Sequence, residues 1–324
     1  MHGFSYLTTP PVRFAPGKGD PYVTRLSDWI QTEGEVTGNP DLMIIGVPLS
    51  KSSISFSGAH SHPQQFRQLW TSFTTYNMDE DIDLAELAAV DLGDVKMHIT
   101  DIPQCHRNIE EALHEVTSRF SGLPVLVGGD HSITYPAICG INRSRKQRVG
   151  LIQFDAHLDV RDTEYGGRSN GTPIRSLIET QALRGEDIVS IGLRSFANSR
   201  EYRAYAEQQG VTIFTAQQVR QKGIQEVLEW TLNYLQAKCD VLYVTFDIDV
   251  LDQSLVPGVP AIGPAGLQAI DVFACAYELG KNQNVIGMDM VCVDPTKDLR
   301  DVTSRVALHV FLHFASGYYR RVKG

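Results

Sequence analysis

Short apolar segments rich in β-branched residues alternate along the chain with longer segments of helical periodicity. The short segments have the length and composition of buried strands, and they cover residues 42–47, 124–127, 149–154, 187–191, 211–214, 241–246 and 284–290. The predicted helices cover residues 61–76, 106–120, 172–183, 223–237, 266–279 and 301–314. Strands that alternate with helices are typical of βαβ units, so the pattern predicts an α/β fold with a mostly parallel sheet covered on both faces.

The same pattern predicts a single domain spanning residues 1–324. No segment has the composition of a linker, and we find no internal repeat. Residues 1–35 are richer in Pro, Gly and polar residues, which favours a loosely packed N-terminal lead-in. In open parallel sheets ligands bind beyond the carboxyl ends of the strands, so polar residues that directly follow an apolar segment are the first candidates for function.

Composition and charge narrow the range of partners. The 324 residues include 29 Lys+Arg and 38 Asp+Glu, a net charge of −9, which gives no electrostatic footprint for nucleic acid or an anionic membrane. No apolar run approaches the ~20 residues of a membrane span, and the N-terminus lacks the pattern of a secretory signal. The five cysteines are scattered without CxxC spacing, so we expect reduced thiols and a cytoplasmic location.

The first polar segment at a predicted strand end is GGDHS at residues 128–132. The two glycines permit a tight turn that would place His131 at the mouth of the sheet. A plain turn, with Asp or Ser capping the next helix, explains the segment equally simply. On its own, this segment is a weak signal of a site.

The second segment, FDAHLD at residues 154–159, carries Asp155, His157 and Asp159 at alternate positions. In extended backbone these side chains would share one face at the end of a buried strand. Carboxylates held so closely repel one another and are costly to desolvate unless a cation compensates them. The alternative is that they splay into a solvated loop.

The third segment, TFDIDVLD at residues 245–252, repeats the alternate spacing with Asp247 and Asp249 after another apolar strand. An EF-hand loop does not fit, because its sixth position holds Asp252 in place of Gly and its twelfth holds Gly258 in place of Glu. Asp252 is therefore expected to be a turn residue and not a ligand.

Together the three strand ends supply a ligand set suited to two hard or borderline divalent cations such as Mn²⁺. The candidate ligands are His131, Asp155, His157, Asp159, Asp247 and Asp249. Two metal ions about 3.5–4 Å apart can share a water molecule and lower its pKa, which produces hydroxide as a nucleophile. The sequence therefore predicts a hydrolase.

These motifs, with GVP at 46–48 and the continuation SLVPGVPAIGPAG at 254–266, resemble the ureohydrolase superfamily, the arginase and agmatinase group. The resemblance implies a three-layer α/β/α sandwich and two Mn²⁺ ions that hydrolyse a C–N bond of a guanidino or amidino group. It implies that His131, Asp155, Asp159 and Asp247 hold one ion, and that His157, Asp155, Asp247 and Asp249 hold the other. Asp159 is the implied catalytic acid and base, passing a proton from water to the departing amine.

Within the superfamily the chain is most similar to formimidoylglutamases, through PLSKSSIS at 48–55, NGTP at 170–173 and RDVTSR at 300–305. The resemblance implies hydrolysis of N-formimidoyl-L-glutamate to L-glutamate and formamide in histidine degradation. Asn170 occupies the position where arginases and agmatinases carry a His that shuttles protons. Cys292, in the pattern VCVDP at 291–295, replaces a Glu that pairs with guanidinium in many ureohydrolases.

A small dianionic substrate would need local positive charge in this acidic chain. Arginine can bind a carboxylate through two parallel hydrogen bonds, so we expect Arg161 first, Arg194 second and Arg175 third to contact substrate, with Asn170 beside them. The alternatives are another amidinohydrolase that releases urea, such as an agmatinase, guanidinobutyrase or arginase-like enzyme, or a metal-binding paralogue without catalysis. By analogy with relatives, a homo-oligomer is expected.

Overall fold

The computed structural model describes residues 3–12, 14, 19–32 and 38–324, and its centre is a nine-stranded parallel sheet. Neighbouring strands of this sheet pair in parallel. Residues 1–2, 13, 15–18 and 33–37 of the predicted lead-in lie outside the described residues. The strand order is β1 (Gln31–Thr32), β5 (Ala89–Asp94), β2 (Leu42–Val47), β6 (Leu123–Gly128), β11 (Val285–Val291), β10 (Val241–Asp247), β7 (Val149–Phe154), β8 (Ile188–Leu193) and β9 (Thr212–Thr215).

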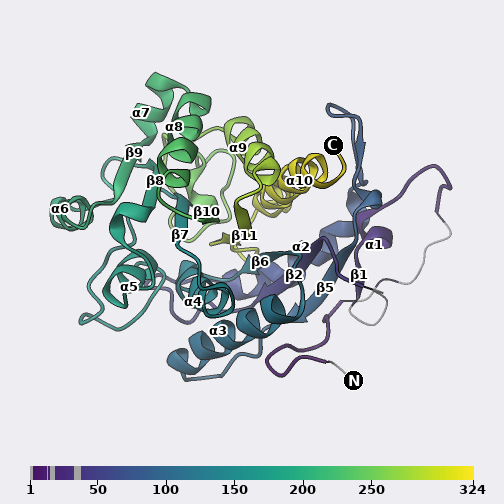
Figure 1. The fold of residues 1–324 in the computed structure, drawn as a ribbon, viewed down its shortest axis with the longest axis horizontal. Helices are drawn as coiled ribbons and strands as arrows, with labels where there is room; N and C mark the ends of the chain where they lie inside the picture. The colour runs from purple at the N-terminus through teal and green to yellow at the C-terminus, as the bar shows by residue number, and fades with distance from the viewer. Residues whose placement is uncertain (1–2, 13, 15–18, 33–37) are drawn as a thin grey trace.

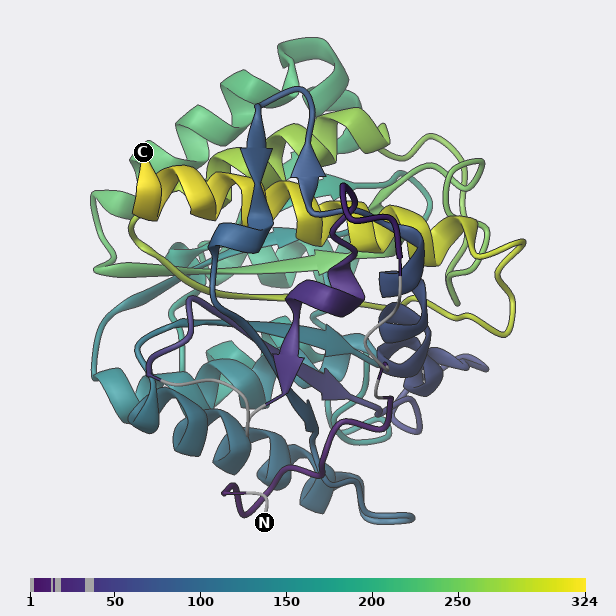
Figure 2. The ribbon, with the colours of Figure 1, turned by 90° about the vertical axis from the view of Figure 1, so that its right-hand side faces the viewer.

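Helices cover both faces of the sheet, which gives the three layers seen in Figures 1 and 2. The apolar side chains sort into two buried clusters, one on each face of the sheet. One cluster includes residues of α1 (Leu26–Trp29), α2 (His62–Gln68), α7 (Ala216–Lys222), α8 (Ile224–Gln236), α9 (Ala269–Lys281) and α10 (Val302–Lys323). The other includes residues of α3 (Ile102–Arg119), α4 (Thr134–Arg145), α5 (Pro173–Glu179) and α6 (Arg200–Gln208).

The predicted α/β/α sandwich is confirmed, because strands buried on both faces are near-continuous apolar runs that sequence patterns detect well. All seven predicted strands are present to within a few residues. The predicted helix over 61–76 ends at Gln68, and a small antiparallel pair, β3 (Tyr76–Asn77) and β4 (Ile82–Asp83), follows it. Among the described residues, none of the helices combines the length and hydrophobicity that a bilayer crossing requires.

Strand β5 was missing from the prediction because acidic residues interrupt its apolar run. Asp91 and Asp94 lie on this strand, and Arg67 of α2 pairs with both. The Arg67 guanidinium donates to the two Asp91 oxygens at 2.7 and 2.8 Å and to Asp94 Oδ1 at 2.7 Å. Since Arg67 is 1% exposed, this is a buried, two-sided ion pair that fastens α2 to the sheet.

Substituting Arg67→Ala should leave the buried Asp91 carboxylate without its cation. We expect the free energy of unfolding in urea to fall by about 3–5 kcal/mol. The control is Arg203→Ala, which removes an exposed i,i+4 pair with Glu207 and should cost at most about 1 kcal/mol. Equal destabilisation by the two substitutions would contradict a structural role for the buried pair.

Candidate metal centre

The predicted ligands meet because they follow three strands, β6, β7 and β10, that lie close together in the sheet. Strands β6, β11, β10 and β7 are adjacent and parallel, so their carboxyl ends lie side by side. His131 follows β6, Asp155 to Asp159 follow β7, and Asp247 ends β10. Residues more than 100 positions apart in the chain are thereby brought to one edge of the sheet.

The segment after β6 is both a capped turn and a way of aiming His131. A Cβ at Gly129 would overlap the backbone oxygen of Leu49, so only glycine fits this turn. Asp130 accepts a hydrogen bond from Ser132 N at 3.0 Å and caps the 3-10 helix over His131–Ile133. This segment therefore caps a helix and also places His131 in the acidic cluster.

Turns, and not extended backbone, bring the acidic side chains together, so the predicted geometry was wrong although the residues meet. Asp155 Oδ1 accepts from His157 N at 2.6 Å, and Asp247 Oδ1 accepts from Asp249 N at 3.0 Å. Both are side-chain-to-backbone turns typical of aspartate. Asp159 has a φ of 52°, a left-handed conformation that costs more for a residue with a Cβ than for glycine.

Two ligand clusters result, and they share Asp155. In the first, His131 Nδ1 lies 3.1 Å from Asp155 Oδ2, 2.9 Å from Asp159 Oδ2 and 3.2 Å from Asp247 Oδ2. In the second, His157 Nδ1 lies 3.2 Å from Asp249 Oδ2 and 3.4 Å from Asp155 Oδ1. The structure thus brings all six predicted ligands to one place, facing one another.

The orientation of His131 is fixed from behind by a buried hydroxyl. His131 Nε2 lies 3.0 Å from Thr245 Oγ, and the Thr245 hydroxyl donates to Asp289. Because that hydroxyl proton is committed to Asp289, Nε2 must be the protonated nitrogen and donate to Thr245. Nδ1 then presents its lone pair to three carboxylate oxygens, and it is a buried atom without a hydrogen-bond partner.

The buried, crowded cluster raises the pKa of Asp247, Asp159 and His157. Burial and the neighbouring Asp249 and Asp155 raise the pKa of Asp247 to about 8. Burial and Asp155 raise the pKa of Asp159 to about 6. Burial opposes charge on His157, but Asp249 and Asp155 outweigh it and raise the pKa of His157 to about 12. The cluster therefore favours any added positive charge at its centre.

The donor set fits a pair of divalent cations. Burial opposes charge on His131, but the three carboxylates raise its pKa well above the usual value, so its Nδ1 faces them favourably only with a proton or a metal cation between them. Imidazole nitrogen and carboxylate oxygen are ligands for Mn²⁺ and similar borderline or hard ions. The nearest cysteine, Cys292, contributes to neither of the clusters.

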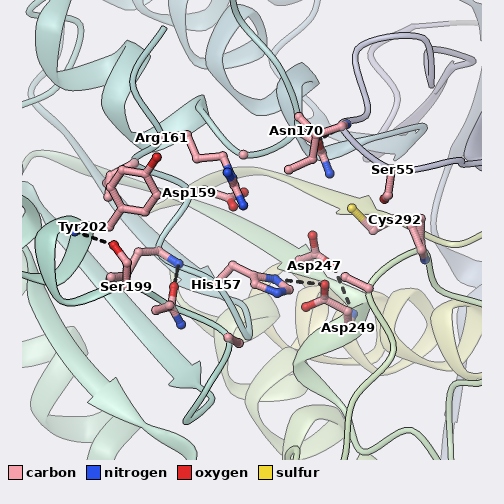
Figure 3. Close-up of a pocket in the computed structure, with 18 residues that line it drawn as sticks. Ser55, His157, Asp159, Arg161, Asn170, Ser199, Tyr202, Asp247, Asp249 and Cys292 are labelled. Atoms are coloured by element: carbon pink, nitrogen blue, oxygen red, sulfur yellow. Dashed lines mark hydrogen bonds and ion pairs between the residues drawn. The ribbon is translucent and has the colours of Figure 1, made fainter. Parts of the chain in front are cut away.

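A cavity of about 510 Å³ opens over these ligands and holds two of the four predicted substrate contacts. Arg161 and Asn170 line it, and Figure 3 shows them across the cavity from His157 and Asp249. Arg194 is directed elsewhere, donating to the backbone oxygens of Gly263 and Ala261 at 2.6 and 3.1 Å. The structure does not bring Arg194 to this cavity.

Arg175 is also kept away from the cavity. Its guanidinium donates to Asp162 at 2.8 Å and to Glu179 at 2.6 Å, and it stacks on the ring of Tyr205. Two carboxylates already compensate its charge, so Arg175 supports the outer face of α5 instead of facing the ligand clusters. Position along the chain alone does not distinguish this arginine from Arg161.

Cys292 lies in the cavity wall beside the acidic cluster (Figure 3). It is 4% exposed, its φ is 65°, and burial together with Asp247 and Asp249 raises the pKa of its thiol well above the usual value. The thiol is therefore neutral, and it supplies no counter-charge for a guanidinium.

Sequence reasoning missed the supporting residues Thr245, Asp289 and Tyr202. Asp289 interrupts the apolar run of β11, and a lone acid in a buried strand is a usable signal of a polar partner. Tyr202 lines the cavity from α6, a helix that the periodicity did not predict. Asp252 behaves as expected, accepting from Ser254 N in a turn.

Substituting Thr245→Val should weaken metal binding while preserving side-chain shape. Without the hydroxyl, His131 Nε2–H has no acceptor and the histidine orientation is no longer fixed, so we expect Mn²⁺ affinity to fall roughly 10–100-fold. The measurement is metal content after dialysis against a series of Mn²⁺ concentrations. Thr245→Ser, which keeps the hydroxyl, should retain the metal, and equal affinity in the Val and Ser variants would refute this role.

Comparisons with known proteins agree over most of the chain. The Arginase family model matches residues 40–316. The chain is 47% identical over 275 residues to the formimidoylglutamase of Halalkalibacterium halodurans, covering 85% of this chain and 86% of that protein. It is 42% identical over 297 residues to the formimidoylglutamase of Bacillus subtilis, covering 91% and 92% of the two chains.

Solved structures give the same result. The crystal structure of the Bacillus subtilis formimidoylglutamase superposes with a TM-score of 0.90 at 40% identity, covering 95% of this chain and 96% of that one. The Trypanosoma cruzi formiminoglutamase solved with two Mn²⁺ ions superposes with a TM-score of 0.84 at 26% identity, covering 92% and 99%. This chain belongs to the arginase family.

Proposed function

We propose that this protein is a formimidoylglutamase, a hydrolase that uses two Mn²⁺ ions to convert N-formimidoyl-L-glutamate and water into L-glutamate and formamide, as in histidine degradation. The observation that carries the proposal is the pair of ligand clusters sharing Asp155 beneath a cavity lined by Arg161, an arginine that pairs with no carboxylate of the described residues. Two relatives that are formimidoylglutamases and more than 40% identical support the same substrate.

His131, Asp155, Asp159 and Asp247 would hold one Mn²⁺ ion, and His157, Asp155, Asp247 and Asp249 the other. The compact first cluster and the shared position of Asp155 support this division. The pair of ions supplies Lewis-acid activation of a water molecule. The chain contributes the fixed ligand positions and a walled cavity in which the amidine carbon can approach.

Asp159 moves the proton. The attack of water on the amidine carbon forms a C–O bond, and the C–N bond to the glutamate nitrogen then breaks. The departing nitrogen needs a proton, and Asp159 takes one from the attacking water and delivers it there. Asp159 lines the cavity beside the ligand clusters, where its carboxylate can reach both the attacking water and the departing nitrogen.

Arg161 binds a substrate carboxylate. Among the residues that the structure describes, no carboxylate pairs with its guanidinium, in contrast to Arg175. Its stem packs on Gly171, and its guanidinium lies 5.8 Å from the centre of the Tyr202 ring. The arginine is thus supported along its length and free at its charged end, toward the middle of the cavity in Figure 3.

Asn170 orients the substrate as a donor. Its Oδ1 accepts from Ile54 N at 2.9 Å, which leaves the amide NH₂ without an acceptor in the described part of the chain. The amide then faces the cavity as a hydrogen-bond donor. An amide cannot shuttle protons, which concentrates that role on Asp159.

The second candidate is a urea-releasing amidinohydrolase, since enzymes of that kind are also relatives, such as the guanidinobutyrase of Pseudomonas aeruginosa at 29% identity. A guanidinium enclosed in this cavity would need a carboxylate beyond the metal ligands. The neutral thiol of Cys292 does not provide one. A formimidoyl group has one nitrogen fewer than a guanidinium, so it depends less on an additional carboxylate.

We also propose that the protein is a single-domain, cytoplasmic homo-oligomer. A single domain is supported by a sheet in which early strands, such as β2, lie beside late ones across β6 and β11. A cytoplasmic location is supported by five free cysteines. Homo-oligomerisation is supported by family analogy, and light scattering of the purified protein tests it.

Turnover with Mn²⁺ tests the proposed reaction directly. Metal-loaded protein should release L-glutamate and formamide in equal amounts from N-formimidoyl-L-glutamate, and at least 100-fold less urea from agmatine, arginine or guanidinobutyrate, roughly the discrimination that an unpaired buried charge imposes. The matched control is Asp249→Ala, which should lose one metal ion and most turnover while keeping its fold. Faster release of urea than of formamide would reverse the assignment.

Substituting Arg161→Gln should raise KM more than it lowers kcat. Losing charge-assisted hydrogen bonds of about 1.5–3 kcal/mol corresponds to roughly a 10–100-fold increase in KM. Steady-state kinetics with formimidoylglutamate measures it. Arg184→Gln, an exposed arginine outside the cavity, is the control with the same change in charge. An unchanged KM for Arg161→Gln would remove this residue from the site.

A further inference from the structure

A second cavity, of about 670 Å³, lies behind the wall of the metal cavity. The loop after β2, the start of α3, the loop 163–169 and α5 surround it. Ile54 lines both cavities, and the wall between them is tied by Asn170 N donating to Ser52 O at 3.1 Å. None of the six metal ligands lines this second cavity.

The charge that lines this cavity is positive, in a protein whose net charge is −9. Lys51 and Arg168 line it, and within the described ranges neither pairs with a carboxylate. Arg168 is held over the ring of Tyr135 at 4.6 Å, which leaves the edge of the guanidinium available. The carboxylate in the lining is that of Glu179, which pairs with Arg175 at 2.6 Å, and Arg175 also pairs with Asp162 at 2.8 Å.

Neutral polar residues complete the lining of this second cavity. Ser53 and Ser176 line the cavity, and their hydroxyl oxygens are buried without a hydrogen-bond partner. Buried hydroxyls without partners are uncommon in folded proteins. His106 is 5% exposed and lies 3.0 Å through Nε2 from Ser132 Oγ. Burial and Arg168 lower the pKa of His106 to about 4, so this ring is neutral and does not oppose an anion or attract a cation.

We propose that this second cavity binds a small oxyanion, a carboxylate or a phosphate, through Arg168 and Lys51. Two lining cations that pair with no carboxylate among the described residues, and a lining acid that already pairs with an arginine, match the chemistry of such an anion. The volume is sufficient for a metabolite larger than a single ion.

Binding is tested on the Mn²⁺-loaded protein by calorimetry, with inorganic phosphate and L-glutamate as separate probes. The probe that binds identifies the source of the oxyanion. Arg168→Gln should weaken that binding roughly tenfold, the effect of losing one charge-assisted contact, and Lys51→Gln should weaken it too. The control is Arg203→Gln, an exposed arginine paired with Glu207, which should bind as the unmodified protein does.

Crystallography distinguishes anion binding in this cavity from binding in the metal cavity. In crystals soaked with selenate, anomalous density should appear beside Arg168 and should be absent from Arg168→Gln crystals. Absence of phosphate and glutamate binding, equal affinity in Arg168→Gln, or density confined to the metal ligands would each overturn the proposal. None of these results depends on hydrolysis of formimidoylglutamate, so the proposed reaction and this site stand or fall separately.

Discussion

Mutual repulsion among buried carboxylates is the constraint on which this structure depends. Asp155, Asp247 and Asp249 are buried, Asp159 lies beside them, and His131 and His157 face them. Such an arrangement is unfavourable unless cations occupy its centre. The left-handed backbone of Asp159 and Cys292 adds local strain at the same place. Carboxylate repulsion and backbone strain both destabilise this part of the fold. The stability that offsets them comes from the apolar layers on both faces of the sheet.

The parallel sheet makes the convergence geometrically simple. Each strand ends at the same edge, so a ligand placed directly after a strand needs only a short turn to face its neighbours. Side-chain-to-backbone hydrogen bonds from Asp155 and Asp247 build those turns with the ligands themselves. Behind them, Thr245 and Asp289 occupy strand positions and hold His131. Support from rigid strands instead of loops keeps the ligand atoms within a narrow range of positions.

The sequence predicted most strands of the sheet and the six side chains that meet at the candidate metal centre, because both depend on local patterns: apolar runs for strands, and paired acids directly after them. It could not predict which arginine faces the cavity. Arg161 and Arg175 lie 14 residues apart with similar neighbours, and only the folded chain shows that Asp162 and Glu179 neutralise the second. Strand β5 was missed for the same reason, because its acidic residues pair with Arg67, which lies more than 20 residues away in the chain.

Opposite charges at the two ends of one cavity determine how a substrate can lie in it. The floor is acidic and, with its cations, prefers the amidine end where charge develops during reaction, whereas Arg161 at the rim prefers carboxylate. A dianionic amino acid with one amidine group satisfies both ends in a single orientation. A substrate with a cationic tail, such as agmatine, would place its ammonium beside the guanidinium of Arg161. The positive charge of Arg161 therefore disfavours substrates with a cationic tail, and this effect is independent of the neutral thiol of Cys292.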